Sequence, residues 1–319
     1  SLSGGRGRLA MTGERIVFLP DYGPAIGGGH VMRSLTLARA LQDRGARCAF
    51  AVGEETARMM RPFTRGEVEL WDADAWPQRP VVAVVDNYAL TADEERALAK
   101  RGMKVAAIDD IGRAHDCDLV VDPGLGRMAA DYPDSAHVLA GAAYALVRPE
   151  FLSTPITRNG GRVLVSLGLT DVSGITAQVV ARLATSPGWQ AADVVLGSGA
   201  ESLEYVREVA AHDPRFTLYV ETDRMAELIA AADLAVGAGG GSAWERACLG
   251  LPTLLLILAD NQRAMARRLE GEEAVIALDV ADPGFDDAFD RELARLLSDA
   301  ALRARLSEAS RALCDGHGA

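Results

Sequence analysis

The stretch Asp21-Tyr22-Gly23-Pro24-Ala25-Ile26-Gly27-Gly28-Gly29-His30-Val31-Met32-Arg33 connects two runs of different hydrophobic pattern. Residues 16–19 are continuously apolar, which predicts a buried strand, and apolar residues recur at helical spacing over residues 31–41. Glycines let a backbone approach a ligand closely because they carry no Cβ atom, and the unpaired N–H groups at the start of a helix attract phosphate. The stretch therefore predicts a strand–turn–helix unit that binds a ligand at its turn.

The histidine of this stretch stands at the predicted start of the helix. The field at a helix start disfavours the imidazolium at His30, and a neutral imidazole can act as a general base near pH 7. A tight turn with an incidental histidine explains the local pattern equally well, because glycine-rich turns between strand and helix are common in α/β proteins. The local pattern leaves both interpretations open.

Composition sets the broad class of the protein. The chain has 319 residues, enough for two domains, with 49% apolar and 24% charged residues. The net charge of −12 implies no broad basic face, so we expect neither a nucleic-acid nor a membrane partner. The longest strongly apolar run, residues 251–259, is too short to span a bilayer.

The cysteines and the first residues bear on the compartment. The four cysteines are scattered without a C-x-x-C pair, which is typical of structural thiols in a reducing compartment. Residues 1–10 lack the apolar region of a signal peptide, and Met11 is the expected native start. We therefore expect a cytoplasmic protein.

Strand and helix signals alternate along nearly the whole chain. The predicted strands are mostly continuous apolar runs, which favours parallel sheets covered on both faces. In the front half they are residues 16–19, 47–52, 81–85, 105–108 and 119–121, and in the rear half 162–167, 193–196, 216–220, 234–236, 253–258 and 275–278.

The pattern lapses between residues 148 and 161, which is the expected interdomain linker. The prediction is an α/β protein with two domains and a cleft between them. We expect an N-terminal domain over residues 11–150, a C-terminal domain over residues 158–300, and a C-terminal helix and tail over residues 301–319. Three front-half strands end in acidic residues, where doubly wound sheets gather ligands.

A second glycine-rich turn, residues 236–245, stands between a predicted strand and a predicted helix. Ser242 is a good N-cap residue, and the glycines before it would offer backbone N–H groups to a diphosphate. Glu245 lies one helical turn further on, where a carboxylate can accept both hydroxyls of a ribose. The alternative is a structural cap whose glutamate only favours the helix dipole.

Other chemistries find weaker support. The chain has no Walker A pattern, and Gly237-x-Gly239-x-x-Ser242 only approaches a dinucleotide fingerprint, so an NAD-dependent oxidoreductase stays a weak alternative. The acidic group that contains His115 and Cys117 matches no common zinc or calcium spacing. We therefore expect neither a metal nor a cofactor.

The motifs together resemble a known family. The run Ile26-Gly27-x-Gly29-His30-x-x-Arg33-x-Leu35-x-Leu37-Ala38 resembles the opening motif of the nucleotide-sugar hydrolases of pseudaminic acid biosynthesis, which are related in fold to MurG-type GT-B glycosyltransferases. Further matches follow in the family's order: Asp86-x-Tyr88, Asp93-Glu94-Glu95, Asp109-Asp110, Cys117-Asp118, Tyr144 to Phe151, Gly168-x-Thr170-Asp171, Glu245-x-Ala247 and Asn261-Gln262.

This resemblance implies a GT-B fold, with two Rossmann-like parallel-sheet domains facing a central cleft. It implies hydrolysis of UDP-2,4-diacetamido-2,4,6-trideoxy-β-L-altropyranose with inversion at the anomeric carbon, and no cofactor or metal. It makes a UDP-sugar the expected partner, and we expect the chain to be a monomer. The implied catalytic residues are His30 as general base, Tyr88 and Asn261. The implied substrate- and UDP-binding residues are Gly28, Gly29, Arg33, Asp86, Gly168, Thr170, Gly239, Gly240, Gly241, Ser242, Glu245 and Gln262.

Two positions depart from the family's pattern. Trp244 stands where a smaller polar residue is usual, and Leu169 where a glycine is usual, so the nucleotide contacts and the sugar isomer can differ. A GT-B glycosyltransferase that passes the sugar to an acceptor, and a non-catalytic nucleotide-sugar binding protein, remain alternative functions.

Overall fold

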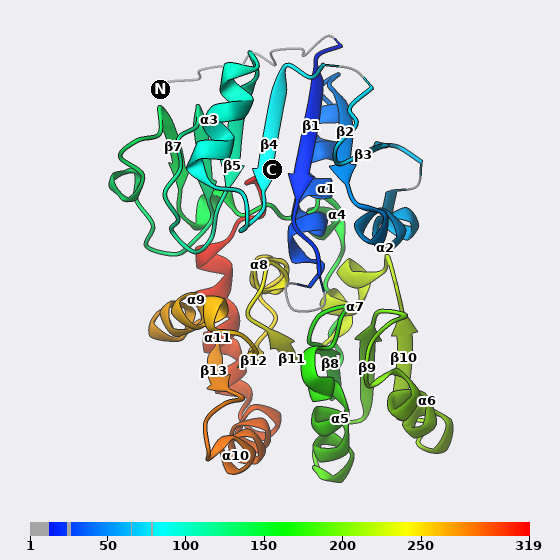
Figure 1. The fold of residues 1–319 in the computed structure, drawn as a ribbon. Helices are drawn as coiled ribbons and strands as arrows, with labels where there is room; N and C mark the ends of the chain where they lie inside the picture. Colours follow the sequence, from blue (N-terminus) through cyan, green and yellow to red (C-terminus); the bar gives the residue numbers. More distant parts are fainter. Residues whose placement is uncertain (1–12, 24–26, 65, 78) are drawn as a thin grey trace. The chain divides into compact units, whose positions relative to one another are not determined.

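The computed structural model describes residues 13–23, 27–64, 66–77 and 79–319. The predicted start at Met11 and residues 24–26 of the first turn lie outside these ranges. The chain forms two compact units, each built on its own sheet (Figure 1). Unit 1 holds the described residues up to Asp21, His30–Asp122 and Met128–Leu139; unit 2 holds Tyr22–Gly29, Pro123–Arg127 and Ala140–Ala319.

The sheet of unit 1 has the strand order β3-β2-β1-β4-β5-β6-β7. Its strands are β1 (Arg15–Pro20), β2 (Arg47–Val52), β3 (Glu69–Asp72), β4 (Val82–Asp86), β5 (Lys104–Ile108), β6 (Leu119–Asp122) and β7 (His137–Ala140). The pairings from β3 through β6 are parallel. The α-helices of this part are α1 (Gly29–Gln42), α2 (Glu54–Thr64) and α3 (Ala92–Lys100), and a short 3-10 helix covers Ala129–Asp131.

The sheet of unit 2 is parallel throughout, with the order β10-β9-β8-β11-β12-β13. Its strands are β8 (Arg162–Ser166), β9 (Ala191–Leu196), β10 (Phe216–Val220), β11 (Leu234–Ala238), β12 (Thr253–Ile257) and β13 (Ile276–Asp279). The α-helices are α4 (Glu150–Ser153), α5 (Ile175–Thr185), α6 (Leu203–His212), α7 (Met225–Ala231), α8 (Ser242–Cys248), α9 (Asp260–Gly271), α10 (Phe285–Ser298) and α11 (Ala300–Leu313). Two 3-10 helices cover Ala142–Tyr144 and Val172–Gly174.

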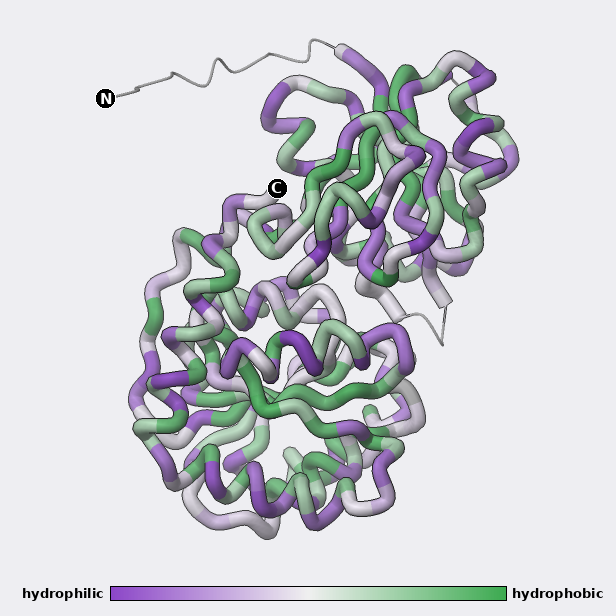
Figure 2. Tube along the Cα trace, turned by 90° about the vertical axis from the view of Figure 1, so that its left-hand side faces the viewer, coloured by the Kyte–Doolittle hydropathy of each residue, from purple (hydrophilic) through white to green (hydrophobic). Residues whose placement is uncertain are grey.

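The continuous apolar runs become strands buried on both faces. Val17 and Phe18 of β1 have no exposed surface, and the Phe18 ring stacks on Phe50 of β2 with 4.9 Å between centroids. In unit 2 the strands are hydrophobic and the outer faces of the helices are hydrophilic (Figure 2). Burial on both faces explains why these strands lack the alternating pattern of a half-exposed sheet.

The predicted strands are confirmed, and the structure adds two that the sequence analysis missed, β3 and β7. Both are four residues long and only partly buried, so neither has the apolar run that marks the other strands. Thr91 and Glu94 form a capping box at the start of α3. All four cysteines are free thiols.

The unit boundaries differ in detail from the predicted domains, whose bounds stay a prediction. The main change of unit falls between Leu139 and Ala140, before the expected linker. Part of that linker is fixed to unit 2, because the Arg158 guanidinium donates to the carbonyls of Leu249 and Gly250. The C-terminal helix α11 also belongs to unit 2, where Leu302 and Leu306 join the core.

Both sheets reverse their strand order next to their first strand, between β1 and β4 in unit 1 and between β8 and β11 in unit 2. In doubly wound sheets, ligands bind at the carboxyl ends of the strands beside this point. The glycine-rich stretch follows β1, Asp86 ends β4, and the second glycine-rich turn follows β11. The topology thus places the sequence motifs at the two switch points.

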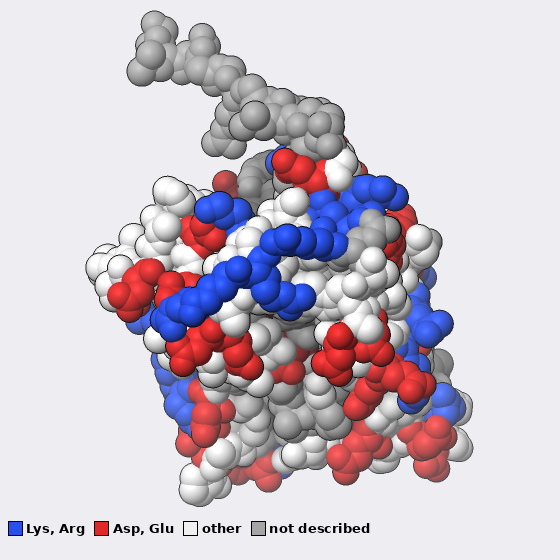
Figure 3. All heavy atoms as spheres, turned by 45° about the horizontal axis from the view of Figure 1, so that its top comes forward, with Lys and Arg blue, Asp and Glu red and all other residues white. Residues whose placement is uncertain are grey.

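Charge is mixed over the surface. Figure 3 shows one face on which lysine and arginine side chains form a band with acidic side chains on both sides of it. On that face, basic and acidic side chains are therefore grouped separately, although the whole chain has a net charge of −12. Among the helices that the structure describes, we find none with the length and apolar composition needed to cross a bilayer.

Candidate active site

His30 lies in the first turn of α1 and is oriented by Asp86. Its Nδ1 is 2.6 Å from Asp86 Oδ1 and 3.1 Å from the Asp86 carbonyl oxygen. Arg33 Nη2, a donor, also lies 3.2 Å from Nδ1, but the shorter contact to the Asp86 carboxylate assigns a hydrogen to Nδ1. In the neutral imidazole, Nε2 then keeps its lone pair. Nε2 makes no hydrogen bond to another described residue, and 6% of the side-chain surface is exposed. A histidine held in this way has the geometry of a general base.

Asp86 ends β4 and is fully buried. Its Oδ1 also accepts from Arg33 Nη2 at 2.6 Å, and its Oδ2 accepts from Arg33 Nε at 2.7 Å and from Ser34 Oγ at 3.2 Å. Burial alone would raise the pKa of Asp86, but the charges and hydrogen bonds of Arg33 and His30 outweigh it and lower that pKa to about 2. Asp86 is therefore a carboxylate at neutral pH, and we assign it to holding His30 rather than to touching a substrate.

Arg33 links this pair to Asp110 and Tyr88. Its Nη1 donates to Asp110 Oδ2, and the Tyr88 hydroxyl donates to Asp110 Oδ1 at 2.6 Å. The Tyr88 ring packs edge-on against the imidazole of His30, with 4.4 Å between centroids and 89° between planes. Burial opposes the charge on Arg33, but Asp86 and Asp110 outweigh it and raise the pKa of Arg33 well above its usual value.

Local sequence explains how these groups meet. His30, Arg33 and Ser34 are spaced i, i+3 and i+4, so they lie on one face of α1. Asp86 and Asp110 follow the carboxyl ends of the adjacent strands β4 and β5. His30, Arg33, Asp86 and Tyr88 were predicted as site residues, whereas Ser34 and Asp110 were not. The position of Asp110 just after a predicted strand is a signal that could have identified it.

The second glycine-rich turn lies in unit 2, between β11 and α8. A Cβ atom on Gly237 would lie 2.6 Å from Arg246 Cζ, and one on Gly239 would lie 3.3 Å from the Gln262 Cβ. Gly240 and Gly241 have open space around them and are exposed. The first two glycines thus make room for packing, and the last two leave the backbone accessible.

The prediction that Ser242 is the N-cap of the helix is wrong. The N-cap is Gly241, and α8 begins at Ser242. Ser242 is itself the first helical residue, and its hydroxyl accepts a hydrogen bond from Arg246 Nη1 at 3.0 Å. With seven residues, α8 offers little helix dipole, so any anion binding here depends on the local N–H groups and on nearby charge.

Glu245 is held by a residue that the sequence analysis quoted only as part of a motif. Arg148 Nε donates to Glu245 Oε1 at 2.9 Å, and Arg148 Cζ lies 4.9 Å from the Phe151 ring centroid. Burial works against the charge of Arg148, but Glu245 outweighs it and raises the pKa of Arg148. Glu245 Oε2 makes no hydrogen bond with another described residue, and it is the oxygen that can accept from a ligand.

The other predicted residues of unit 2 are near this turn or on a second one. Gln262 packs beside Gly239, and its Oε1 accepts from the Leu258 N–H at 3.1 Å. Asn261 is exposed at the start of α9. Gly168 follows β8 with φ of +108°, which favours glycine, and Thr170 Oγ1 would lie 3.7 Å from a Cβ on Gly27. Gly28 and Gly29 lead into α1, next to His30.

One group of potential metal ligands occurs in the described chain, formed by Glu95, His115 and Cys117. Its geometry is that of an ion pair, because His115 Nδ1 is 2.6 Å from Glu95 Oε1 and Nε2 is 3.6 Å from Asp109 Oδ2. Burial lowers the pKa of His115, but these carboxylates outweigh it and raise the pKa to about 9. Burial also raises the pKa of the Cys117 thiol to about 11, so it stays protonated. The group holds a buried imidazolium.

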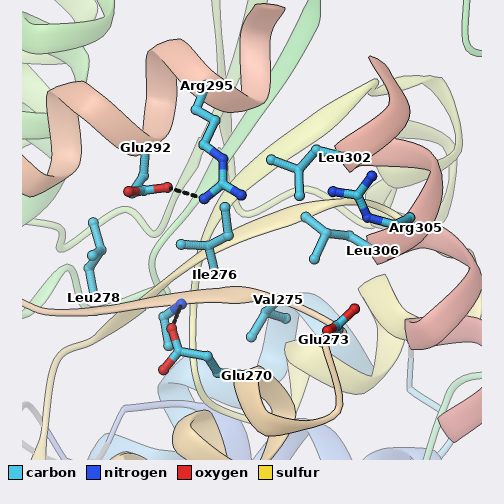
Figure 4. Close-up of a pocket in the computed structure, with 11 residues that line it drawn as sticks. Glu270, Glu273, Val275, Ile276, Leu278, Glu292, Arg295, Leu302, Arg305 and Leu306 are labelled. Atoms are coloured by element: carbon cyan, nitrogen blue, oxygen red, sulfur yellow. Dashed lines mark hydrogen bonds and ion pairs between the residues drawn. The ribbon is translucent and has the colours of Figure 1, made fainter. Parts of the chain in front are cut away.

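A hollow of about 430 Å³ lies along the edge strand β13 (Figure 4). Its lining mixes apolar side chains with charged ones, including the ion pair of Glu292 and Arg295. Glu270 accepts the Ala277 N–H in its wall, which blocks one donor of the strand edge. None of the predicted site residues lines this hollow.

Comparison with known proteins first establishes the structural class. Acinetobacter baumannii MurG superposes with a TM-score of 0.63 at 15% identity, covering 96% of each chain. Together with the two parallel Rossmann-like sheets, this shows that the chain has the GT-B fold that the sequence analysis predicted. No family model matches the chain.

Two proteins with similar sequences then show which members of this structural class the chain resembles. The Bacillus subtilis (strain 168) spore coat polysaccharide biosynthesis protein SpsG is 27% identical over 190 residues, 58% of this chain and 56% of that protein. The Campylobacter jejuni UDP-2,4-diacetamido-2,4,6-trideoxy-beta-L-altropyranose hydrolase is 22% identical over 229 residues, 67% of this chain and 81% of that protein. The resemblance to this hydrolase that the motifs suggested is thus confirmed, and the chain spans little more than half of the first relative.

Proposed function

We propose that this chain is an enzyme that hydrolyses a UDP-2,4-diacetamido-2,4,6-trideoxy sugar at its anomeric carbon. The observation that carries the proposal is the His30–Asp86 pair, with 2.6 Å between Nδ1 and Oδ1 and a proton-accepting Nε2. The printed name of the Campylobacter jejuni relative supports the substrate, and the GT-B fold supports a nucleotide-sugar ligand.

In the proposed reaction, His30 Nε2 takes a proton from water as the water oxygen attacks the anomeric carbon. The bond between that carbon and the β-phosphate oxygen breaks, and its electron pair leaves with UDP. Attack from the face opposite the leaving group inverts the anomeric centre, as in inverting glycosidases. Asp86 keeps the hydrogen of His30 on Nδ1 and stabilises the imidazolium that forms.

The proposed UDP contacts come from unit 2. UDP is a good leaving group, and the accessible N–H groups around Gly240 and Gly241 would stabilise charge on its β-phosphate. Glu245 Oε2 would accept from ribose hydroxyls, and the hydrogen bond from Arg148 to the other oxygen supports this role. Tyr88, in contact with the His30 imidazole, and Asn261 would contact the sugar.

Hydrolysis of the UDP-sugar in water enriched in oxygen-18 tests this proposal, with the products analysed by mass spectrometry and the anomeric signals followed by NMR. We expect UDP release without any acceptor, no label in UDP, and first appearance of the inverted sugar anomer. Label in UDP would mean that a phosphorus–oxygen bond breaks and would refute the mechanism.

A GT-B glycosyltransferase is the second candidate, favoured by the structural likeness to MurG. A transferase needs an acceptor, so UDP release in the absence of an acceptor separates the two functions. Tight UDP-sugar binding with no turnover under either condition would instead indicate a binding protein.

A further inference from the structure

Arg246 is a buried cation directly beneath the turn proposed to hold the diphosphate. Its side chain is 2% exposed and ranks among the largest fully buried side chains of the chain. Nη2 donates to the Ala238 carbonyl at 2.6 Å, and Nη1 donates to Ser242 Oγ at 3.0 Å. The guanidinium therefore joins the last residue of β11 to the first residue of α8, across the base of the glycine turn.

The backbone is shaped to admit this side chain. A Cβ on Gly237 would come within 2.6 Å of Arg246 Cζ and within 2.7 Å of Nη1. Gly237 does not have a positive φ, so its backbone conformation does not demand glycine. Glycine is needed at position 237 because a Cβ atom would overlap the space that the Arg246 guanidinium occupies.

The charge of Arg246 is not balanced by a neighbouring carboxylate. Arg246 forms no ion pair within the described part of the chain, and its Nε has no hydrogen-bond partner there. The adjacent Glu245 accepts instead from Arg148, whose Nε donates to Oε1. Burial lowers the pKa of Arg246 to about 10, with only a partial opposing effect from Glu245, so the group remains charged at neutral pH.

Arg33, in the same chain, is a buried arginine whose charge is compensated by carboxylates. Its guanidinium contacts the carboxylates of Asp86 and Asp110, and their charges raise its pKa. An isolated buried charge costs several kcal/mol unless an opposite charge compensates it. Among the described residues, the Arg246 guanidinium donates to a carbonyl and a hydroxyl and to no carboxylate, so we expect the compensating anion to come from a ligand.

We propose that Arg246 is a positioning residue that holds the glycine turn and makes it select ligands carrying a diphosphate over the bare nucleoside. This inference rests on the proposed function. A bound diphosphate would lie over the turn and offset the buried charge, while Ser242 and the Ala238 carbonyl keep the guanidinium in place. If the two charges lie about 8 Å apart, their attraction at an effective dielectric constant of about 20 corresponds to about 30-fold in affinity.

The test compares the dissociation constants of UDP and uridine, measured by calorimetry, for wild type, Arg246→Met and Arg246→Lys. We expect Arg246→Met to weaken UDP binding about 30-fold and to change uridine binding less than about 3-fold. We expect Arg246→Lys, which keeps the charge and loses the forked geometry, to retain most of the preference for UDP.

Arg158→Met is the matched control. Arg158 also donates to two carbonyls, those of Leu249 and Gly250 at the other end of α8, and burial lowers its pKa to about 10 as well. Its loss removes a comparable cation without touching the glycine turn, so the ratio of UDP to uridine affinity should stay at the wild-type value.

The outcomes are distinct. An unchanged ratio in Arg246→Met, or an equal loss in the lysine and methionine variants, overturns the role of Arg246 while leaving the proposed function intact. If the wild-type protein binds UDP no more tightly than uridine, the proposed diphosphate site is itself refuted. If Arg246→Met does not fold, Arg246→Gln takes its place, because it keeps a polar side chain and removes the charge: an unchanged ratio contradicts the proposal, and a ratio lowered about 30-fold supports it.

Discussion

Replacing Asp86 by asparagine changes one oxygen of the buried carboxylate to an N–H₂ donor. That carboxylate now accepts from four donors on three residues, His30, Arg33 and Ser34. If the amide nitrogen faces His30, Nδ1 must become the acceptor, the hydrogen moves to Nε2, and the base is lost. If it faces Arg33 Nε, two donors oppose each other inside the protein. Both arrangements remove the charge that compensates Arg33.

The magnitudes follow from these contacts. Breaking a buried ion pair by removing one partner costs about 3–5 kcal/mol, and we expect the lower end because Arg33 keeps Asp110. The same change in the serine-protease triad lowers turnover about 10⁴-fold through the wrong tautomer. For Asp86→Asn we expect a loss of turnover of about 10²- to 10⁴-fold.

Turnover of the UDP-sugar, UDP affinity and urea unfolding of Asp86→Asn together check this prediction. UDP affinity should stay within about twofold of wild type, because the proposed UDP contacts belong to unit 2. Ser34→Ala serves as control, since it removes only the 3.2 Å contact and keeps the charge. The reasoning fails if Asp86→Asn is destabilised as expected yet turns over within threefold of wild type.

Three further predictions concern stability and nucleotide binding. The pKa of His115 in the folded protein is about 9 against an ordinary 6.5, so its protonation adds about 3 kcal/mol to the free energy of unfolding. This contribution is fully present below pH 6.5 and is lost as the pH rises through 9. Urea unfolding measured at several pH values should show the loss, and His115→Gln should abolish it. Gly237→Ala should lower the free energy of unfolding by about 1–3 kcal/mol, because its Cβ meets Arg246, whereas Gly240→Ala should change it by less than about 0.5 kcal/mol. In calorimetry, Glu245→Gln should weaken the binding of uridine more than that of 2′-deoxyuridine. Equal losses of affinity for the two nucleosides would refute the proposed contact between Glu245 and the ribose hydroxyls.

Much of the fold follows from local sequence. The unbroken apolar runs of β1 and β12 predict both the strands and their burial on two faces. Burial on two faces in turn indicates parallel sheets. The strand β3 could not be found this way, because Trp71 is its single buried residue. Strand order also lies beyond local pattern, since it depends on which runs pair across the chain.

The candidate site was only partly predictable. His30 and Asp86 each followed from a turn and a strand end, but their pairing joins residues 56 positions apart and needed the topology. Arg246 was missed because an arginine on a short helix suggests a solvated face. A signal was present, since Arg246 stands four residues after Ser242 among the buried residues Ala243, Trp244 and Ala247. The N-cap was assigned one residue too late, because the helix already begins at Ser242.

Single-turnover hydrolysis of the UDP-sugar by His30→Ala, measured beside its UDP affinity, decides whether His30 is the base. We expect the hydrolysis rate to fall about 10²- to 10⁴-fold while the UDP dissociation constant stays within about twofold of wild type. A rate close to that of wild type would contradict the role of His30 and, with it, the mechanism built on the His30–Asp86 pair.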